Sequence, residues 1–162
     1  MQLSIGMHAV RSPLRSAIAL FAALATCLAL AFPATGYAAT AKSGKSAHKK
    51  EKVVFQVSEA DQKTWNLALN NMKNVQQSLG QKNVDVELVV YGPGIGMLKI
   101  DSPVGNRVND AVSAGVKVVA CENTMHAQKL TKEDMLASIG YVPGGVVELM
   151  KRQKQGYAYI RP

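Results

Sequence analysis

The sequence predicts a single α/β domain over residues 53–162, built on a mostly parallel sheet of about five strands with helices on both faces. Three observations support this fold class. Short valine-rich runs alternate with longer segments in which apolar residues repeat at helical spacing. The run VKVVAC at 116–121 is apolar at successive positions, as in a strand that is covered on both faces. Glycine or proline lies at most of the boundaries between these segments.

The first strand and the first helix occupy residues 53–79. The β-branched run 53–58 predicts a buried strand. Ser58 and Asp61 have the spacing of a capping box, so we expect the helix to begin close to Ser58. Its apolar positions repeat at helical spacing, and Gly80 predicts its end. The residues expected to face inward are Trp65, Ala68, Leu69, Met72, Val75 and Leu79.

The middle of the domain repeats this alternation. Residues 84–91 predict the second strand, and a glycine-rich loop follows at 92–101. Ser102 and Pro103 favour the start of a helix, which should end at Gly115. The run VKVVAC then forms the third strand, which we expect in the middle of the sheet because both of its faces are apolar.

The C-terminal third completes the sheet. The elements expected here are a loop or short helix at 122–130, a short helix from Thr131 to Ser138, strands at 139–142 and 157–160, and between these strands a helix that begins at Pro143. Thr131 and Asp134 have the spacing of a capping box. In the last helix we expect Val146, Leu149 and Met150 to face inward.

Residues 1–41 have the composition of a secretory signal peptide. Arg11 and Arg15 precede the apolar run 17–32, and small residues follow it. The run has about 16 residues, fewer than the ~20 that cross a bilayer. Cleavage is expected after Ala38 or Ala41. We therefore expect a periplasmic or secreted protein with no stable membrane span after cleavage.

Residues 42–52 predict a basic, disordered linker. This stretch contains five lysines against one glutamate and has no apolar periodicity. The chain carries a formal net charge of +8, but the linker and the signal segment hold most of it, which leaves about +2 for residues 53–162. A basic linker can bind an anionic membrane or nucleic acid, but an exported protein rarely meets nucleic acid, so we expect no nucleic-acid partner.

Cys121 is the main candidate for chemistry. Removal of the signal also removes Cys27, so Cys121 would be the single cysteine of the mature chain and would form no internal disulfide. It ends the third strand, at the edge of the sheet where α/β proteins bind ligands. Backbone N–H groups of a following helix would favour a reactive thiolate, whereas the adjacent Glu122 would disfavour it. The residues alone leave open both a nucleophile and a small buried core residue.

The second candidate site is the glycine loop with Gly92, Gly94 and Gly96. Glycine allows backbone to approach a ligand closely, but this spacing matches neither the dinucleotide-binding motif nor the P-loop. A tight turn without a ligand explains the same residues. As a binding site, the loop and Asn123 would donate N–H groups to an anionic sulfur on Cys121.

A third alternative is a copper(I) carrier. Cys121, Met125 and His126 offer two soft sulfur ligands and an imidazole, which would suit copper(I). Their spacing belongs to no established metal motif, so we expect neither a metal nor another cofactor.

Four stretches cover most of the domain, VVFQVSEADQKTWNLALNNMKN, VVYGPGIGMLKID, GVKVVACENTM and VPGGVVELMKRQKQGYAYIRP. In these stretches the chain resembles the DsrE/DsrF-like family, small α/β proteins associated with sulfur transfer, and most closely its exported, stand-alone branch. The resemblance implies a flavodoxin-like sheet and assembly into homotrimers or hexamers. In the sulfur-relay members a cysteine at this edge of the sheet carries persulfide sulfur, and in this chain only Cys121 matches it.

Two main functions are therefore expected. In the first, the protein is a periplasmic sulfur acceptor and carrier, sulfurtransferase-like if active. Cys121 would take sulfur from a thiol or persulfide donor and pass it to an acceptor protein. In the second, it is a non-catalytic oligomeric protein of the same fold that binds a small ligand or acts as a scaffold, with Cys121 buried.

We expect the mature chain to begin at Ala39 or Lys42, because small residues follow the apolar run of the signal segment. N-terminal sequencing of the protein recovered from its native host measures this directly. A chain that begins at Met1 or Met7 would contradict the prediction.

Overall fold

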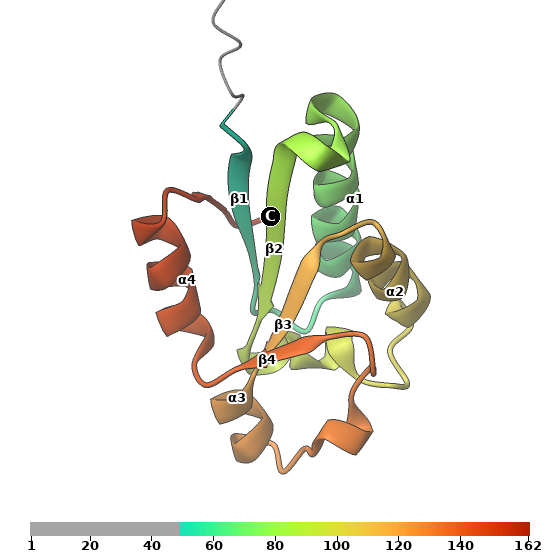
Figure 1. The fold of residues 1–162 in the computed structure, drawn as a ribbon. Helices are drawn as coiled ribbons and strands as arrows, with labels where there is room; N and C mark the ends of the chain where they lie inside the picture. Colours follow the sequence, from blue (N-terminus) through green and yellow to red (C-terminus); the bar gives the residue numbers. More distant parts are fainter. Residues whose placement is uncertain (1–48) are drawn as a thin grey trace, which may run out of the picture. The chain divides into compact units, whose positions relative to one another are not determined.

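The computed structural model describes residues 49–162, which alternate strands and helices (Figure 1). The expected signal segment and residues 42–48 of the expected linker lie outside the described residues. Five strands form one sheet in the order β4-β3-β2-β1-β5, and all of its strand pairs are parallel. The predicted α/β fold with a parallel sheet and flavodoxin-like arrangement is confirmed.

The bounds of the elements are as follows. The strands are β1 (Glu51–Val57), β2 (Val84–Val90), β3 (Lys117–Cys121), β4 (Gly140–Val142) and β5 (Ala158–Ile160). The helices are α1 (Gln62–Leu79), α2 (Gly105–Ser113), α3 (Glu122–Ala127) and α4 (Gly145–Lys154). Three short 3-10 helices join them, η1 (Gln81–Asn83), η2 (Gly92–Leu98) and η3 (Lys132–Asp134). Within residues 49–162, no helix combines the length and the apolar character that a bilayer span requires.

Helices cover both faces of the sheet, but the two faces differ. α1 and α2 lie on one face and α4 lies on the other (Figure 1). Alternate residues of each strand serve the two layers, so Leu88 of β2 packs toward α1 and α2 while Val89 packs toward α4. The core on the α1 and α2 face is large. The core on the α4 face consists of Val54, Val89, Val119, Val142 and Leu149, with Tyr91 and Tyr157 packed against it.

The order of the strands fixes where the chain reverses direction across the sheet. β1 to β4 are added side by side in one direction, and the connection through α4 then returns to the far side of β1. α3, which leaves β3, packs Met125 into the core on the α1 and α2 face, whereas α4, which leaves β4, packs Leu149 on the opposite face. The topological switch point therefore lies between the ends of β3 and β4. Open α/β sheets bind ligands at this kind of position.

The sheet extends further toward the N-terminus than the sequence pattern suggests. β1 begins at Glu51, which pairs with Val84, so the expectation of disorder is wrong for Glu51 and Lys52. Lys50 also forms an ion pair with Asp85 at 2.5 Å. Polar residues enter the strand here because β2 offers a backbone partner along its whole length, and charged side chains are tolerated at the exposed end of the pair.

The expected helix starts are displaced by a few residues. Asp61, not Ser58, caps α1, since its carboxylate accepts from the backbone N–H of Lys63 at 3.2 Å and of Thr64 at 3.0 Å. α2 begins at Gly105 because a turn comes first, in which the Gly105 N–H donates to Ser102 O at 3.0 Å. A capping residue can serve either a turn or a helix, and the sequence pattern does not separate the two.

Several side chains face the opposite way from the expectation. In α4, Val146 is 54 % exposed and Met150 is 53 % exposed, while Glu148 is buried beside Leu149. In α1, Leu79 is exposed and Gln76 is buried, where its amide donates to Ala114 O at 2.8 Å. Gln76 has its partner on a neighbouring segment and Glu148 has its partners on its own helix, and an apolar periodicity reveals neither. The expected helix to Ser138 is also shorter, because η3 ends at Asp134.

Gly94 marks the closest approach between η2 and the end of β1. A Cβ atom at Gly94 would lie 2.9 Å from Val57 O, whereas one at Gly96 would meet only the Trp65 ring at 3.4 Å. We expect Gly94→Ala to lower the free energy of unfolding by about 2 kcal/mol, because the backbone must shift to admit the methyl group. The control Gly96→Ala should cost about 0.5 kcal/mol or less. Urea unfolding of both variants measures the difference, and equal losses would contradict this account of the contact.

Candidate functional site

Cys121 lies at the switch point. It is the last residue of β3 and pairs in register with Val142, the last residue of β4. The side chain is 5 % exposed, and α3 begins at the next residue, Glu122. The sequence correctly placed this thiol at the carboxyl edge of the sheet, in an interior strand, although the central strand is β2.

The surroundings of Cys121 favour its thiolate. Burial raises the pKa of the Cys121 thiol, but hydrogen bonds to the sulfur outweigh this effect, and the net pKa is lowered. The largest opposing contribution comes from the Thr124 side chain, followed by the backbone of Gly145, Thr124 and Asn123. Donors that point at a thiolate stabilise the charged form, which is the form that acts as a nucleophile.

Two helix starts supply these donors. Asn123 and Thr124 belong to the first turn of α3, directly after Cys121. Gly145 is the first residue of α4, and the N-cap Gly144 makes no side-chain capping bond, so the first-turn N–H groups of α4 remain available. The Asn123 N–H is shared, since it also donates to Pro143 O at 3.2 Å. This bond ties the start of α3 to the loop that leads into α4.

The absence of a side chain at Gly145 allows α4 to begin this close to the sheet edge. A Cβ atom at Gly145 would lie 2.9 Å from Cδ1 of Tyr91, which directly follows β2. The Tyr91 side chain is half-buried, and burial raises its pKa. A larger residue at position 145 would require α4 or the Tyr91 side chain to shift.

The glycine loop contributes indirectly. The Gly92 N–H donates to Oγ1 of Thr124 at 2.9 Å, and the Gly94 N–H donates to Ser58 O at 2.9 Å. Gly96 lies against the Trp65 ring. Gly92 and Gly94 therefore give their N–H groups to protein acceptors, and the role that Gly92 has here is to hold the Thr124 hydroxyl.

Sequence reasoning missed Thr124 and Gly145. A threonine three residues after the cysteine is a local signal, since a side chain at that spacing returns to the residue that precedes the helix. Gly145 gives a weaker signal. The run Pro143-Gly144-Gly145 predicts a helix start without a capping side chain, but only the strand order brings that start beside Cys121.

The residues considered for copper do not come together. Met125 is buried in the core on the α1 and α2 face, whereas His126 on the same short helix is exposed. Across residues 49–162, no group of three or more histidine, cysteine, aspartate or glutamate side chains is arranged to hold a metal ion.

A row of polar side chains continues along the carboxyl edge toward β5. The Tyr159 hydroxyl donates to Oε1 of Gln56 at 2.6 Å, and the Gln56 amide donates to Oγ of Ser58 at 3.2 Å. Arg161, which follows β5, forms an ion pair with Glu59 after β1. These groups and Tyr91 give the edge a polar surface on one side of the thiol site.

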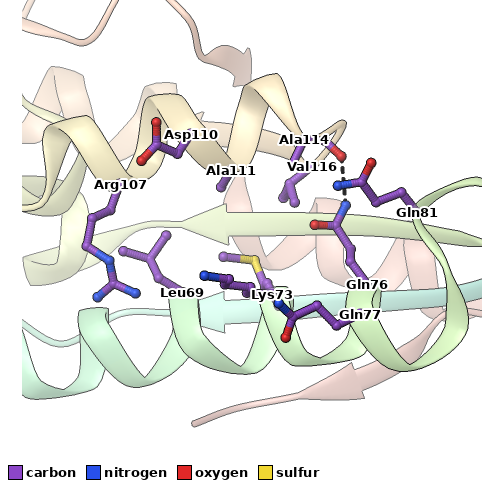
Figure 2. Close-up of a pocket in the computed structure, with 11 residues that line it drawn as sticks. Leu69, Lys73, Gln76, Gln77, Gln81, Arg107, Asp110, Ala111, Ala114 and Val116 are labelled. Carbon is purple, nitrogen blue, oxygen red and sulfur yellow. Dashed lines mark hydrogen bonds between the residues drawn. The ribbon is translucent and has the colours of Figure 1, made fainter.

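A cavity lies elsewhere, between α1 and α2 (Figure 2). Its volume is about 380 Å³, and its lining includes Leu69, Val116, Lys73, Arg107 and Asp110. Val116 directly precedes β3, so the cavity lies at the opposite end of that strand from Cys121. The volume is within the range of small-ligand pockets, and the lining contains no cysteine, serine or threonine. It is therefore separate from the thiol site.

Residues 51–162 match the model of the DsrE/DsrF-like family. No curated protein matches the chain. Among solved structures, the protein of unknown function MTH1491 from Methanobacterium thermoautotrophicum is 34 % identical with a TM-score of 0.67, and the match covers 70 % of this chain and 100 % of that one.

Two further structures resemble the chain in fold. The conserved protein of unknown function BT1422 from Bacteroides thetaiotaomicron is 13 % identical with a TM-score of 0.58, over 69 % of this chain and 95 % of that one. The ychN protein from E. coli is 12 % identical with a TM-score of 0.56, over 70 % of this chain and 99 % of that one. At these identities the likeness concerns the fold alone.

Thr124→Val should raise the pKa of the Cys121 thiol, because the variant loses the side-chain hydrogen bond that lowers this pKa most. At a fixed pH near neutrality less thiolate is then present, and alkylation of the folded protein by iodoacetamide should slow by about three-fold or more. The pH profile of the alkylation rate should move to higher pH. Thr131→Val, the same change in the exposed turn of η3, is the control and should leave the profile in place. Identical profiles for the two variants would show that the Thr124 side chain does not lower the pKa of Cys121.

Proposed function

The chain belongs to the DsrE/DsrF-like family, and from this membership we propose that it is an exported sulfur carrier that accepts sulfane sulfur on Cys121. One observation carries the proposal. A single thiol lies at the switch point of the sheet, and hydrogen bonds from two helix starts lower its pKa. This is the environment that a nucleophilic cysteine requires.

The proposed chemistry consists of two exchange steps without net oxidation or reduction. The Cys121 thiolate attacks the terminal sulfur of a donor persulfide, R–S–SH. The S–S bond of the donor breaks, RS⁻ leaves with the bonding electron pair, and Cys121–S–SH forms. An acceptor thiolate then attacks the outer sulfur of Cys121–S–SH, takes it as a new persulfide, and restores the Cys121 thiolate.

The donors around Cys121 suit both steps. When the acceptor attacks, Cys121 is the leaving group, and a thiol with a lowered pKa leaves more readily. The Thr124 hydroxyl and the Gly145 N–H would stabilise the negative charge on the sulfur each time it forms. The chain needs no cofactor for this reaction, since the donor supplies the sulfur and the acceptor removes it.

We further propose that the exchange takes place in the periplasm or outside the cell, in a homotrimer or hexamer, with a separate thiol or persulfide protein as donor or acceptor. The N-terminal composition supports export. Exposed apolar residues support self-association, since Val146, Val147 and Met150 are 54 %, 59 % and 53 % exposed on α4.

The second candidate is a non-catalytic protein that binds a small ligand. Two observations favour it, namely the low exposure of Cys121 at 5 % and the 380 Å³ cavity between α1 and α2. In this case Cys121 completes the core, and ligands bind at the other end of β3. The two candidates differ in one measurable property, the accessibility of the thiol in the folded protein.

Cys121→Ser should abolish sulfur acceptance without loss of the fold. After incubation with glutathione persulfide, mass spectrometry of the mature protein should detect one added sulfur atom on Cys121 and none in the variant. Serine is close in size to cysteine, so the unfolding midpoint should change little. If the folded thiol resists both the persulfide and iodoacetamide and reacts only in denaturant, Cys121 is a core residue and the binding or scaffold function is favoured instead.

A further inference from the structure

A buried carboxylate lies beneath α4. Glu87 is on β2, the central strand, and its residue is only 2 % exposed. It alternates with Val86 and Leu88, which belong to the core on the α1 and α2 face, so the Glu87 side chain faces α4. A charged residue at this position needs partners on the elements packed against it.

Arg152, two turns after the start of α4, is the principal partner. Its Nε lies 2.6 Å from Oε2 of Glu87 and 2.9 Å from Oε1 of Glu148, which is also buried. We call Glu87, Arg152 and Glu148 the α4 clamp. Around it, Lys117 of β3 lies 3.6 Å from Glu87, and Lys151 lies 3.5 Å from Glu148. The Arg152 guanidinium also stacks over the Tyr157 ring at 5.4 Å.

The α4 clamp is a poor source of stability. Oε1 of Glu87 has no hydrogen-bond partner, and Nε of Arg152 makes no aligned hydrogen bond to either carboxylate. Burial raises the pKa of Glu87, although the charges of Arg152 and Lys117 act against this effect. Well-packed apolar residues would hold α4 to the sheet at lower cost than charges that are taken out of water. We therefore expect these charges to contribute to the position of α4 more than to the stability of the domain.

Few other contacts fix the position of α4. In the apolar cluster on the α4 face, Leu149 is the one buried residue that the helix provides, while Val146, Val147 and Met150 are exposed. An apolar cluster of this size allows a helix to slide, whereas the ion pair between Arg152 of α4 and Glu87, which is fixed in β2, defines one position, and Glu148 of α4 orients the guanidinium. α4 is one continuous helix from Gly145 to Lys154, so the position of Arg152 also sets the position of Gly145.

We propose that the α4 clamp is a positioning device for the reactive thiol, because it holds the first turn of α4, which begins at Gly145, beside Cys121 at the end of β3. This inference rests on the proposed function of Cys121. Arg152 and Glu87 are positioning residues. They act on the thiol indirectly, because they set the position of α4. The Gly145 contact with Tyr91 and the Asn123 bond to Pro143 guide the first turn of α4, and the clamp fixes the rest.

The test uses Glu87→Leu in the mature protein. Leucine fills the buried space, and Arg152 keeps Glu148 as its counter-ion, so the variant should fold. Alkylation of Cys121 by iodoacetamide at neutral pH should slow by about three-fold, and its pH profile should move to higher pH. In NMR spectra of the unaltered protein, the Gly145 amide resonance should shift as Cys121 titrates. In Glu87→Leu this shift should be lost.

Lys151→Met is the matched control. Lys151 lies next to Arg152 and forms an ion pair with Glu148 of the same helix. Within residues 49–162 it forms no ion pair with a residue of the sheet. Its removal should leave both the alkylation profile and the Gly145 response unchanged. If Glu87→Leu does not fold, Glu87→Leu with Arg152→Met removes both charges and gives the same test.

The outcomes separate this inference from the proposed function. If the unaltered protein accepts no sulfur but Glu87→Leu still abolishes the Gly145 response, the sulfur-carrier function fails and the α4 clamp stands. If Glu87→Leu folds with an unchanged profile and an unchanged Gly145 response, the clamp is wrong, whether or not Cys121 accepts sulfur. Loss of folding in both the single and the double variant would make the cluster a stability element and would also overturn the proposal.

Discussion

The rest of the site depends on the contact between the first turn of α4 and the end of β3. This contact follows from strand order, because the chain reverses across the sheet between β3 and β4 and so sends two helix starts away from one point. Cys121 ends β3 at that point, and groups of both helix starts lower the pKa of its thiol. Without α4 the thiol would keep only the donors of α3. Burial, which raises its pKa, would then be offset by fewer groups that lower it.

The glycine loop and the thiol form one unit through Thr124. The Gly92 N–H donates to the Thr124 hydroxyl, and that hydroxyl contributes most to lowering the pKa of Cys121. Gly94 in turn fixes the loop to the end of β1 through its bond to Ser58 O. Three neighbouring strand ends thus support one sulfur atom, although only β3 carries the cysteine. The close approach that the loop glycines allow is between segments of the protein itself.

Much of the fold and part of the site could be predicted from the sequence. The alternation of apolar runs and helical periodicities depends on neighbouring residues, so it predicted the parallel sheet and placed Cys121 at its carboxyl edge. Gly145 could not be found in this way, because its contact with Cys121 depends on how β4 lies beside β3. The same limit explains α4, where Val146 and Met150 are exposed and Glu148 is buried. Arg152 of that helix pairs with Glu87, a buried charge on β2, and no periodicity in the helix itself reveals this partner.

The two faces of the sheet therefore serve different purposes. On the α1 and α2 face, a large apolar core gives the domain its stability. On the α4 face, a small apolar cluster is combined with Glu87, Arg152 and Glu148, and these charges give the helix a defined position. A thiolate is sensitive to displacements of its donors well below the size of a side chain, since hydrogen bonds weaken steeply with poor alignment. Ionic contacts on this face are thus consistent with a helix whose task is to hold one N–H group in place.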